Sequence, residues 1–197
     1  ITLSNGTPLY ELPDSMTNGI KGIYQGIYRV NDTDRFVGQP FSVRMTTANG
    51  KVIEKDSKAL FSILSQTGPE VVITNNRLSH LEYGLGDDRL GGAKIGYLDT
   101  LVPLKVIGKV GVDYKIQLAP GRTAYIEDKH VNPLPRGTFP PSSLTDKIRV
   151  YADSIHDYVK LGLFQKLPYQ SFQQVDPARI IVDVFGATSN TNWIDFP

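Results

Sequence analysis

The chain has 197 residues, 40% of them hydrophobic, which is enough for one large core or two to three small ones. Its 21 Lys and Arg residues nearly balance its 20 Asp and Glu residues, and the net charge of +1 gives no basic footprint for nucleic acid or for a membrane surface. No apolar run approaches the ~20 residues of a membrane span, and the absence of cysteine excludes disulfides, thiolate metal sites and cysteine nucleophiles.

The two ends of the sequence suggest processing. The chain begins with "ITLSNG", without an initiator Met or a signal peptide. We therefore expect a processed or truncated product from which any targeting segment has been removed. We also expect that more chain once followed the C-terminal "NTNWIDFP".

Turn residues are frequent, with 18 Gly and 13 Pro, and aromatic and β-branched residues lie between them, which predicts an all-β fold with little helix. In residues 41–54, Phe41, Val43 and Met45 share one face and Asn49-Gly50 follows. Because Asn-Gly accepts positive φ at both turn positions, we predict a hairpin there. "ALFSIL" and "EVVITN" are further strand candidates, although residues 57–65 also fit one short helix.

Residues 84–92, "GLGDDRLGG", form a glycine-rich stretch, which predicts either a linker or an ordered loop with tight turns. Asp87 and Asp88 suggest calcium or phosphate, but the alternating oxygens and closing Glu of a calcium loop are absent. The Lys-Ser/Thr ending of a phosphate loop is absent too. We therefore interpret the stretch as a glycine-rich turn with Asp–Arg hydrogen bonds.

Four short strands are predicted from residue 93 onward, with the sequences "AKIGYLD", "VPLKVIGKV", "DYKIQL" and "TAYIED". Pro120-Gly121 forms the turn between the last two. This spacing favours a small barrel. Residues 132–143 contain four prolines and mark the clearest domain boundary in the chain.

The last block contains the strand candidates "KIRVYAD" at 147–153, "HDYVKLGLF" and "RIIVDVFG" at 179–186. Both faces of residues 179–186 are mostly apolar. We therefore predict that this strand lies between two layers.

Catalytic motifs are missing from the sequence. His80, His130 and His156 form neither HExxH nor a close pair, which indicates surface or turn histidines; a zinc site assembled from all three by folding is the less favoured alternative. A G-x-S-x-G nucleophile motif is absent as well. We therefore expect this chain to hold no catalytic residues, no metal ligands and no cofactor.

Aromatic side chains are the strongest binding candidates, since each combines a flat apolar face with a polar tip. The candidates are Tyr97, Tyr114, Tyr125, Tyr151, Tyr158, Tyr169 and Trp193. For any single tyrosine the alternative is packing in a small β core. Trp193 lies in the polar setting "SNTNWIDF", which favours exposure or a domain contact.

The hairpin "YKIQLAPGRTAYI" carries Tyr114, Ile116 and Leu118 on its first strand, then Gly121, Arg122, Ala124, Tyr125 and Ile126. This pattern resembles the closing hairpin of bacterial Src-homology-3-like domains, a W/Y-x-V-x-L strand followed by a G-R-x-G-W-V/I strand. Ala124 stands where Gly is usual, and Tyr125 where Trp is usual. The upstream "LDTLVPLKVIGKV" fits the preceding strands, and the resemblance implies a small barrel.

"IRVYADSIHDYVKLGL" and "DPARIIVDVFGATSN" resemble an AMIN-type domain, a small β-sandwich that precedes the catalytic domain of many N-acetylmuramoyl-L-alanine amidases. "GLGDDRLGGAKIGYLDT" together with "SNTNWI" resembles Bacteroides-type cell-wall amidases. The zinc ligands of that family lie downstream of "NTNWI", so the resemblance implies zinc only in a catalytic domain outside this chain. It implies a Src-homology-3-like barrel at 86–135 and an AMIN-like sandwich at 141–197. Residues 1–85 are less recognisable, and we expect them to form an accessory β-rich domain of the same assembly.

The resemblance implies a peptidoglycan-targeting region of a periplasmic amidase, which cleaves the amide between N-acetylmuramic acid and L-alanine. The expected partners are the glycan or stem peptide and the downstream amidase domain, with neither nucleic acid nor a membrane span. The ligand-binding candidates are Tyr97, Tyr114, Arg122, Tyr125, Asn192 and Trp193. Two alternatives stay open: a scaffold that binds a protein partner in the cell envelope, and an unrecognised hydrolase in the N-terminal region.

Overall fold

A computed structural model describes residues 1–31, 34–64, 70–86, 91–145 and 148–189. The chain is nearly all β, with several small antiparallel sheets, which confirms the predicted fold class. It divides into two compact units: Ile1–Ile63 with Lys109–Gly111, and Leu64–Gly108 with Val112–Pro197. In the described part of the chain, no helix has the length and apolar character needed to cross a bilayer.

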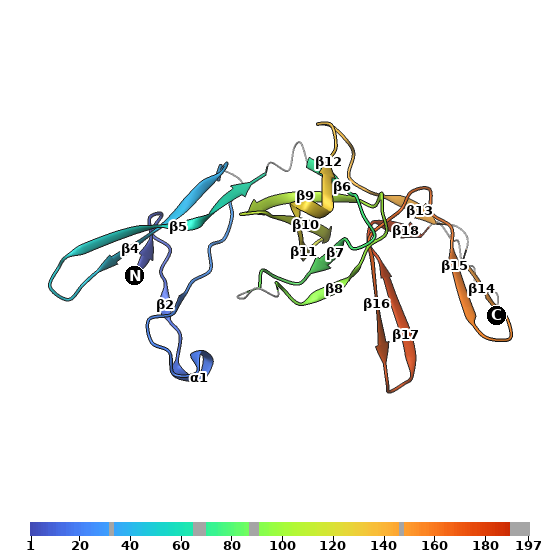
Figure 1. The fold of residues 1–197 in the computed structure, drawn as a ribbon, viewed down its shortest axis with the longest axis horizontal. Coiled ribbons are helices and arrows are strands. Elements are labelled where there is room, and N and C mark those ends of the chain that lie inside the picture. Colours follow the sequence, from blue (N-terminus) through green and yellow to red (C-terminus); the bar gives the residue numbers. More distant parts are fainter. Residues whose placement is uncertain (32–33, 65–69, 87–90, 146–147, 190–197) are drawn as a thin grey trace, which may run out of the picture. The chain divides into compact units, whose positions relative to one another are not determined.

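The first unit contains two antiparallel groups of strands and one helical turn (Figure 1). One group pairs β1 with β4 and β4 with β5, and the other pairs β2 with β3. The elements are β1 (Thr2–Leu3), β2 (Tyr10–Glu11), α1 (Asp14–Thr17), β3 (Tyr24–Gln25), β4 (Gln39–Thr46) and β5 (Val52–Ile63).

The hairpin predicted at Asn49-Gly50 is confirmed. Thr46 pairs with Val52, and the Thr47 N–H donates to the Lys51 carbonyl oxygen across the turn. Gly50 has a φ of +80°, whereas Asn49 is not among the residues with positive φ. The turn therefore uses one left-handed residue rather than the two expected, because its loop is longer than two residues.

The short helix considered at residues 57–65 is wrong, because β5 continues through Ile63. Leu60 pairs with Pro40 and Phe61 pairs with Gln39 on β4. The Phe61 ring packs against Phe41, with 4.4 Å between centroids. Exposure alternates with a period of two over 57–61, as a strand with one covered face requires.

The second unit is built on a larger sheet, with strand order β12-β6-β9-β10-β11-β7-β8. Its elements are β6 (Glu70–Thr74), β7 (His80–Glu82), β8 (Lys94–Tyr97), β9 (Pro103–Val110), β10 (Asp113–Ala119), β11 (Arg122–Glu127), the 3-10 turn η1 (Asp128–His130) and β12 (Val131–Pro133). The predicted Pro120-Gly121 turn joins β10 to β11, and Gly121 has a φ of +74°. The predicted closed barrel is wrong for the described strands, because β8 pairs only with β7 and β12 only with β6, which leaves both as edges of an open sheet.

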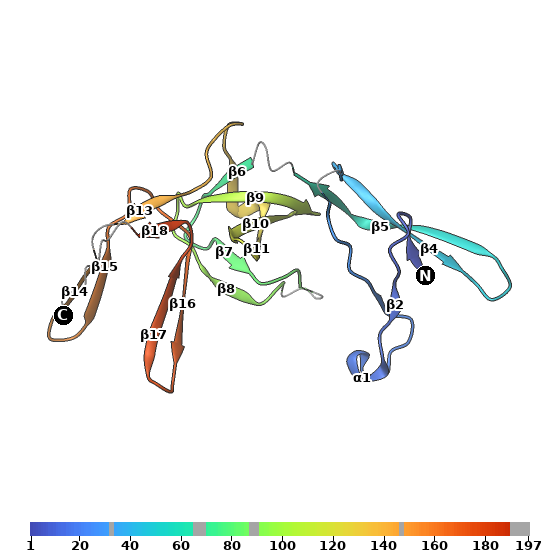
Figure 2. The same ribbon diagram turned by 180° about the vertical axis from the view of Figure 1, so that it is seen from behind.

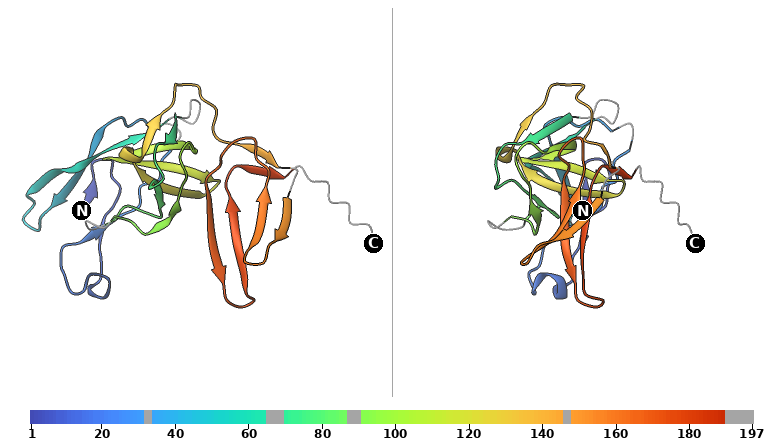
Figure 3. Two further views of the ribbon diagram at one scale, coloured as in Figure 1. Left: turned by 45° about the vertical axis from the view of Figure 1, so that its right-hand side comes forward. Right: turned by 90° about the vertical axis from the view of Figure 1, so that its right-hand side faces the viewer.

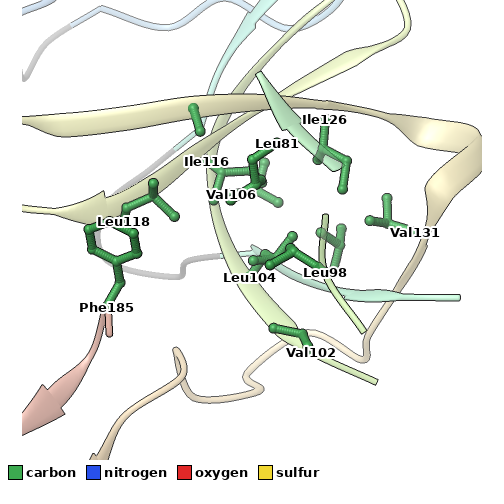
Figure 4. Close-up of a cluster of buried hydrophobic side chains, with 12 residues drawn as sticks. Leu81, Leu98, Val102, Leu104, Val106, Ile116, Leu118, Ile126, Val131 and Phe185 are labelled. Carbon is green, nitrogen blue, oxygen red and sulfur yellow. The ribbon is translucent and has the colours of Figure 1, made fainter. Parts of the chain in front are cut away.

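The core of this unit lies on one face of the sheet (Figure 4). Alternate residues of the strands point into it, so that Ile116 and Leu118 on β10 meet Ala124 and Ile126 on β11. Phe185, from the C-terminal block, lies next to Leu118. The buried cluster consists of Val72, Leu81, Leu98, Val102, Leu104, Val106, Ile116, Leu118, Ala124, Ile126, Val131 and Phe185.

The C-terminal block consists of three two-stranded sheets (Figures 2 and 3). A parallel pair joins β13 (Ser143–Thr145) to β18 (Ala187–Ser189), and two hairpins pair β14 (Ile148–Ala152) with β15 (Asp157–Leu161) and β16 (Tyr169–Gln174) with β17 (Arg179–Val184). The prediction that residues 179–186 lie between two layers is wrong. Ile180 and Val182 are 76% and 55% exposed, because β17 belongs to a two-stranded ribbon, and only Phe185 beyond its end is buried.

The predicted domain boundaries remain a prediction. Two strands that precede residue 86 pair within the sheet of the second unit: β6 with β9 and β12, and β7 with β11 and β8.

Candidate functional site

The outer face of the sheet carries one row of polar and aromatic side chains across four strands. Lys115 on β10 pairs with Tyr125 on β11, Tyr125 with Glu82 on β7, and Glu82 with Lys94 on β8. Their strand neighbours Ile116, Ala124 and Leu81 are fully buried on the core side. Because successive side chains point to opposite faces, this row, which we call the outer row, faces away from the core.

A tyrosine–lysine pair lies at each end of the outer row. The Lys94 ammonium lies 3.1 Å from the Tyr97 hydroxyl and 5.2 Å from the centre of its ring. The Lys115 ammonium lies 5.7 Å from the centre of the Tyr125 ring. Tyr97 is 53% exposed, so its ring offers an open apolar face beside a cation. Such a pair can stack on a flat apolar surface while it holds a carboxylate.

Glu82 ties the outer row to the glycine-rich stretch. One carboxylate oxygen lies 3.2 Å from Nε2 of His80, and the other accepts a hydrogen bond of 2.9 Å from the Gly92 N–H. Glycine is required at 92, because a Cβ there would collide with the Gly84 carbonyl oxygen. The Gly92 end of the stretch is therefore held against β7, while the predicted Asp–Arg hydrogen bonds at 87–89 lie outside the described residues.

His80 and His130 lie side by side, with 5.3 Å between ring centroids, although fifty residues separate them in the sequence. Burial, followed by the charges of His80 and Lys129, lowers the pKa of His130, and Glu127 and Glu82 act in the opposite direction. A neutral His130 can accept a hydrogen bond at Nδ1 from the Asn76 amide, 3.3 Å away.

His80 sits between two acceptors. Its Nδ1 lies 3.0 Å from the Leu78 carbonyl oxygen, and its Nε2 faces the Glu82 carboxylate. Only the charged imidazolium can donate at both positions. His80 therefore has a hydrogen-bond acceptor within reach of each ring nitrogen.

Sequence reasoning missed this cluster by treating the histidines as isolated surface or turn residues. The spacing His80-x-Glu82 places both side chains on one face of a strand, and this signal was visible in the sequence. The approach of His130 to His80 depends on the position of the turn η1, which the sequence does not indicate. His156 lies beside Tyr158 in the β14–β15 hairpin. Among the described residues, no three His, Asp or Glu side chains are arranged to hold a metal ion.

The structure places the predicted ligand-binding residues in different surroundings. Tyr97 and Tyr125 lie on the outer face of the sheet, whereas Tyr114 packs against the core. The Arg122 guanidinium lies 3.3 Å from the Asp183 carboxylate and 5.1 Å from the centre of the Phe185 ring. Asn192 and Trp193 lie outside the described residues.

Comparisons of this chain with protein-family models, with curated proteins and with solved structures found no match.

Proposed function

We propose that this chain is a peptidoglycan-targeting region that holds an N-acetylmuramoyl-L-alanine amidase at the cell wall in the periplasm. The observation that supports it best is the pair of tyrosine–lysine contacts, Tyr97 with Lys94 and Tyr125 with Lys115, on one face of the sheet. The proposal that the attached enzyme is an amidase rests on the sequence resemblance to Bacteroides-type amidases. Its catalytic zinc belongs to a downstream domain, where it would activate the attacking water.

The chemistry of the outer face suits this polymer. Sugar rings present flat C–H faces that can stack on tyrosine, and the stem peptides carry carboxylates that lysine can pair with. Tyr97 is 53% exposed, so its ring is accessible to a long polymer. Binding here would raise the local concentration of substrate around the attached amidase domain.

Sedimentation with isolated sacculi tests the proposal. We expect Tyr97→Ala and Tyr125→Ala to weaken binding about 2- to 10-fold each, since one aromatic contact is worth about 0.5–1.5 kcal/mol. Tyr10→Ala is the matched control, because Tyr10 is 70% exposed and belongs to the first unit. Equal binding by all three variants and the unmodified chain would contradict the proposal.

A scaffold for a protein partner in the envelope is the second candidate, and the β14–β15 hairpin favours it. Val150 and Val159 form a cross-strand pair, and each is 74% exposed. Ile148 extends the same face and is also exposed. Such an aliphatic face suits a protein better than a hydrated glycan. Loss of a complex in the envelope on Val150→Lys, with sacculus binding unchanged, would favour this function.

A further inference from the structure

A cavity of about 370 Å³ lies in the second unit, where β9 begins and β10 ends against the C-terminal block. It differs from the outer row in its lining of prolines and core side chains. Four prolines from three connecting segments form much of the wall, and Leu118 and Phe185 of the core cluster border it. Those prolines are Pro120, Pro140, Pro141 and Pro168.

The wall is stiff and poor in hydrogen-bond donors. Proline fixes its own φ and has no N–H group, so this part of the lining offers carbonyl oxygens and C–H surface. The Pro168 carbonyl already accepts a hydrogen bond from the Phe185 N–H, which fastens the end of β17 beside the cavity. An apolar body of low flexibility therefore fits against this wall.

Two polar residues, Lys105 and Gln117, line the same cavity. Both are partly buried, and neither forms an ion pair or a side-chain hydrogen bond with another described residue. The cavity thus combines a wall of prolines and core side chains with a lysine that forms no ion pair in the described part of the chain. A carboxylate can pair with that lysine in a charge-assisted hydrogen bond.

We propose that this cavity binds a short peptide with small apolar side chains and a carboxylate that pairs with Lys105. The volume corresponds to about a dozen water-sized groups at ~30 Å³ each, which is the size of a dipeptide. The chemical class follows from the cavity alone. The natural source of this ligand rests on the proposed function, in which the stem peptides of the wall carry the alanine methyl groups and carboxylates.

The test uses N-acetyl-alanyl-alanine and its C-terminal amide as probes, with the full chain observed by NMR. We expect the acid to shift the amide signals of Lys105, Leu118, Phe185 and Gly186 with a dissociation constant on the order of 1 mM. The amide should bind at least about tenfold more weakly, because it lacks the charged acceptor.

Three variants sharpen the test. Lys105→Gln should abolish the difference between acid and amide, and Ala119→Leu should fill the cavity and abolish both sets of shifts. Lys160→Gln, an exposed lysine on β15, is the matched control and should leave binding unchanged. If a variant does not fold, the comparison of acid and amide on the unmodified chain decides alone.

The proposal is overturned if the acid causes no saturable shifts up to about 10 mM, if acid and amide bind equally, or if the shifts lie elsewhere in the chain. Such a failure leaves sacculus binding through Tyr97 intact. Peptide binding by a chain that does not bind sacculi would instead contradict only the proposed function.

Discussion

Phe185 packs the C-terminal block against the core of the second unit, so its removal measures how much this apolar contact contributes to joining them. Its side chain is 6% exposed and lies next to Leu118 (Figure 4). Burying an aromatic ring removes about 150–250 Å² from water, worth about 4–6 kcal/mol at about 25 cal/mol per Å². The stacked Arg122 guanidinium adds about 0.5–1 kcal/mol.

Phe185→Ala keeps the Cβ, so we expect the free energy of unfolding to fall by about 3–5 kcal/mol, the usual range for buried Phe→Ala. Native-state hydrogen exchange is the suitable assay, because a chain of two units need not unfold in one step. The free energy of opening measured by exchange should fall at the amides of Ile116 and Ile126, which lie deep in the core. Phe164→Ala, at an exposed position of the same block, should change these values by less than about 0.5 kcal/mol. A loss below about 1 kcal/mol for Phe185→Ala would refute the view that it anchors the block.

Three further predictions concern the second unit. Leu101 has a φ of +62° and is exposed, so Leu101→Gly should raise the free energy of unfolding by about 0.5–1 kcal/mol, whereas Leu78→Gly, at an exposed leucine without positive φ, should lower it. The lowered pKa of His130 means that folding favours its neutral form. The free energy of unfolding should therefore fall as the pH drops below the ordinary pKa of 6.5, and level off below the folded pKa. Urea titrations should show a weaker pH dependence of stability in His130→Gln, and an unchanged dependence would contradict this assignment. Glu82→Gln should speed hydrogen exchange at Gly92, because its carboxylate oxygen accepts from that N–H, and exchange as slow as in the unmodified chain would show that the contact does not hold the loop.

The sequence predicted the local elements well where a short-range pattern determined them. Asn49-Gly50 and Pro120-Gly121 gave the two hairpins, because turn chemistry is local. Residues 57–65 fitted both a helix and a strand, and the choice depended on cross-strand contacts such as Phe61 with Phe41. Short apolar runs are ambiguous for this reason.

Burial and the site depended on distant partners and were predicted less well. Ile180 and Val182 read as a strand between layers, yet β17 pairs in a two-stranded ribbon and leaves them exposed. The placement of Tyr97 and Tyr125 on one face requires the pairing of β11 with β7, across forty residues of sequence. The contact of His80 with His130 requires the position of η1. None of these long-range contacts follows from local periodicity.

Hydrogen-exchange mass spectrometry of the chain bound to sacculi tests the central claim, that the outer face of the sheet contacts the wall. We predict slower exchange in β7, β8 and β11, the strands that carry His80, Glu82, Tyr97 and Tyr125, while α1 and the β14–β15 hairpin exchange as in the free chain. Protection confined to β14–β15, or no protection in bound chain, would contradict the account.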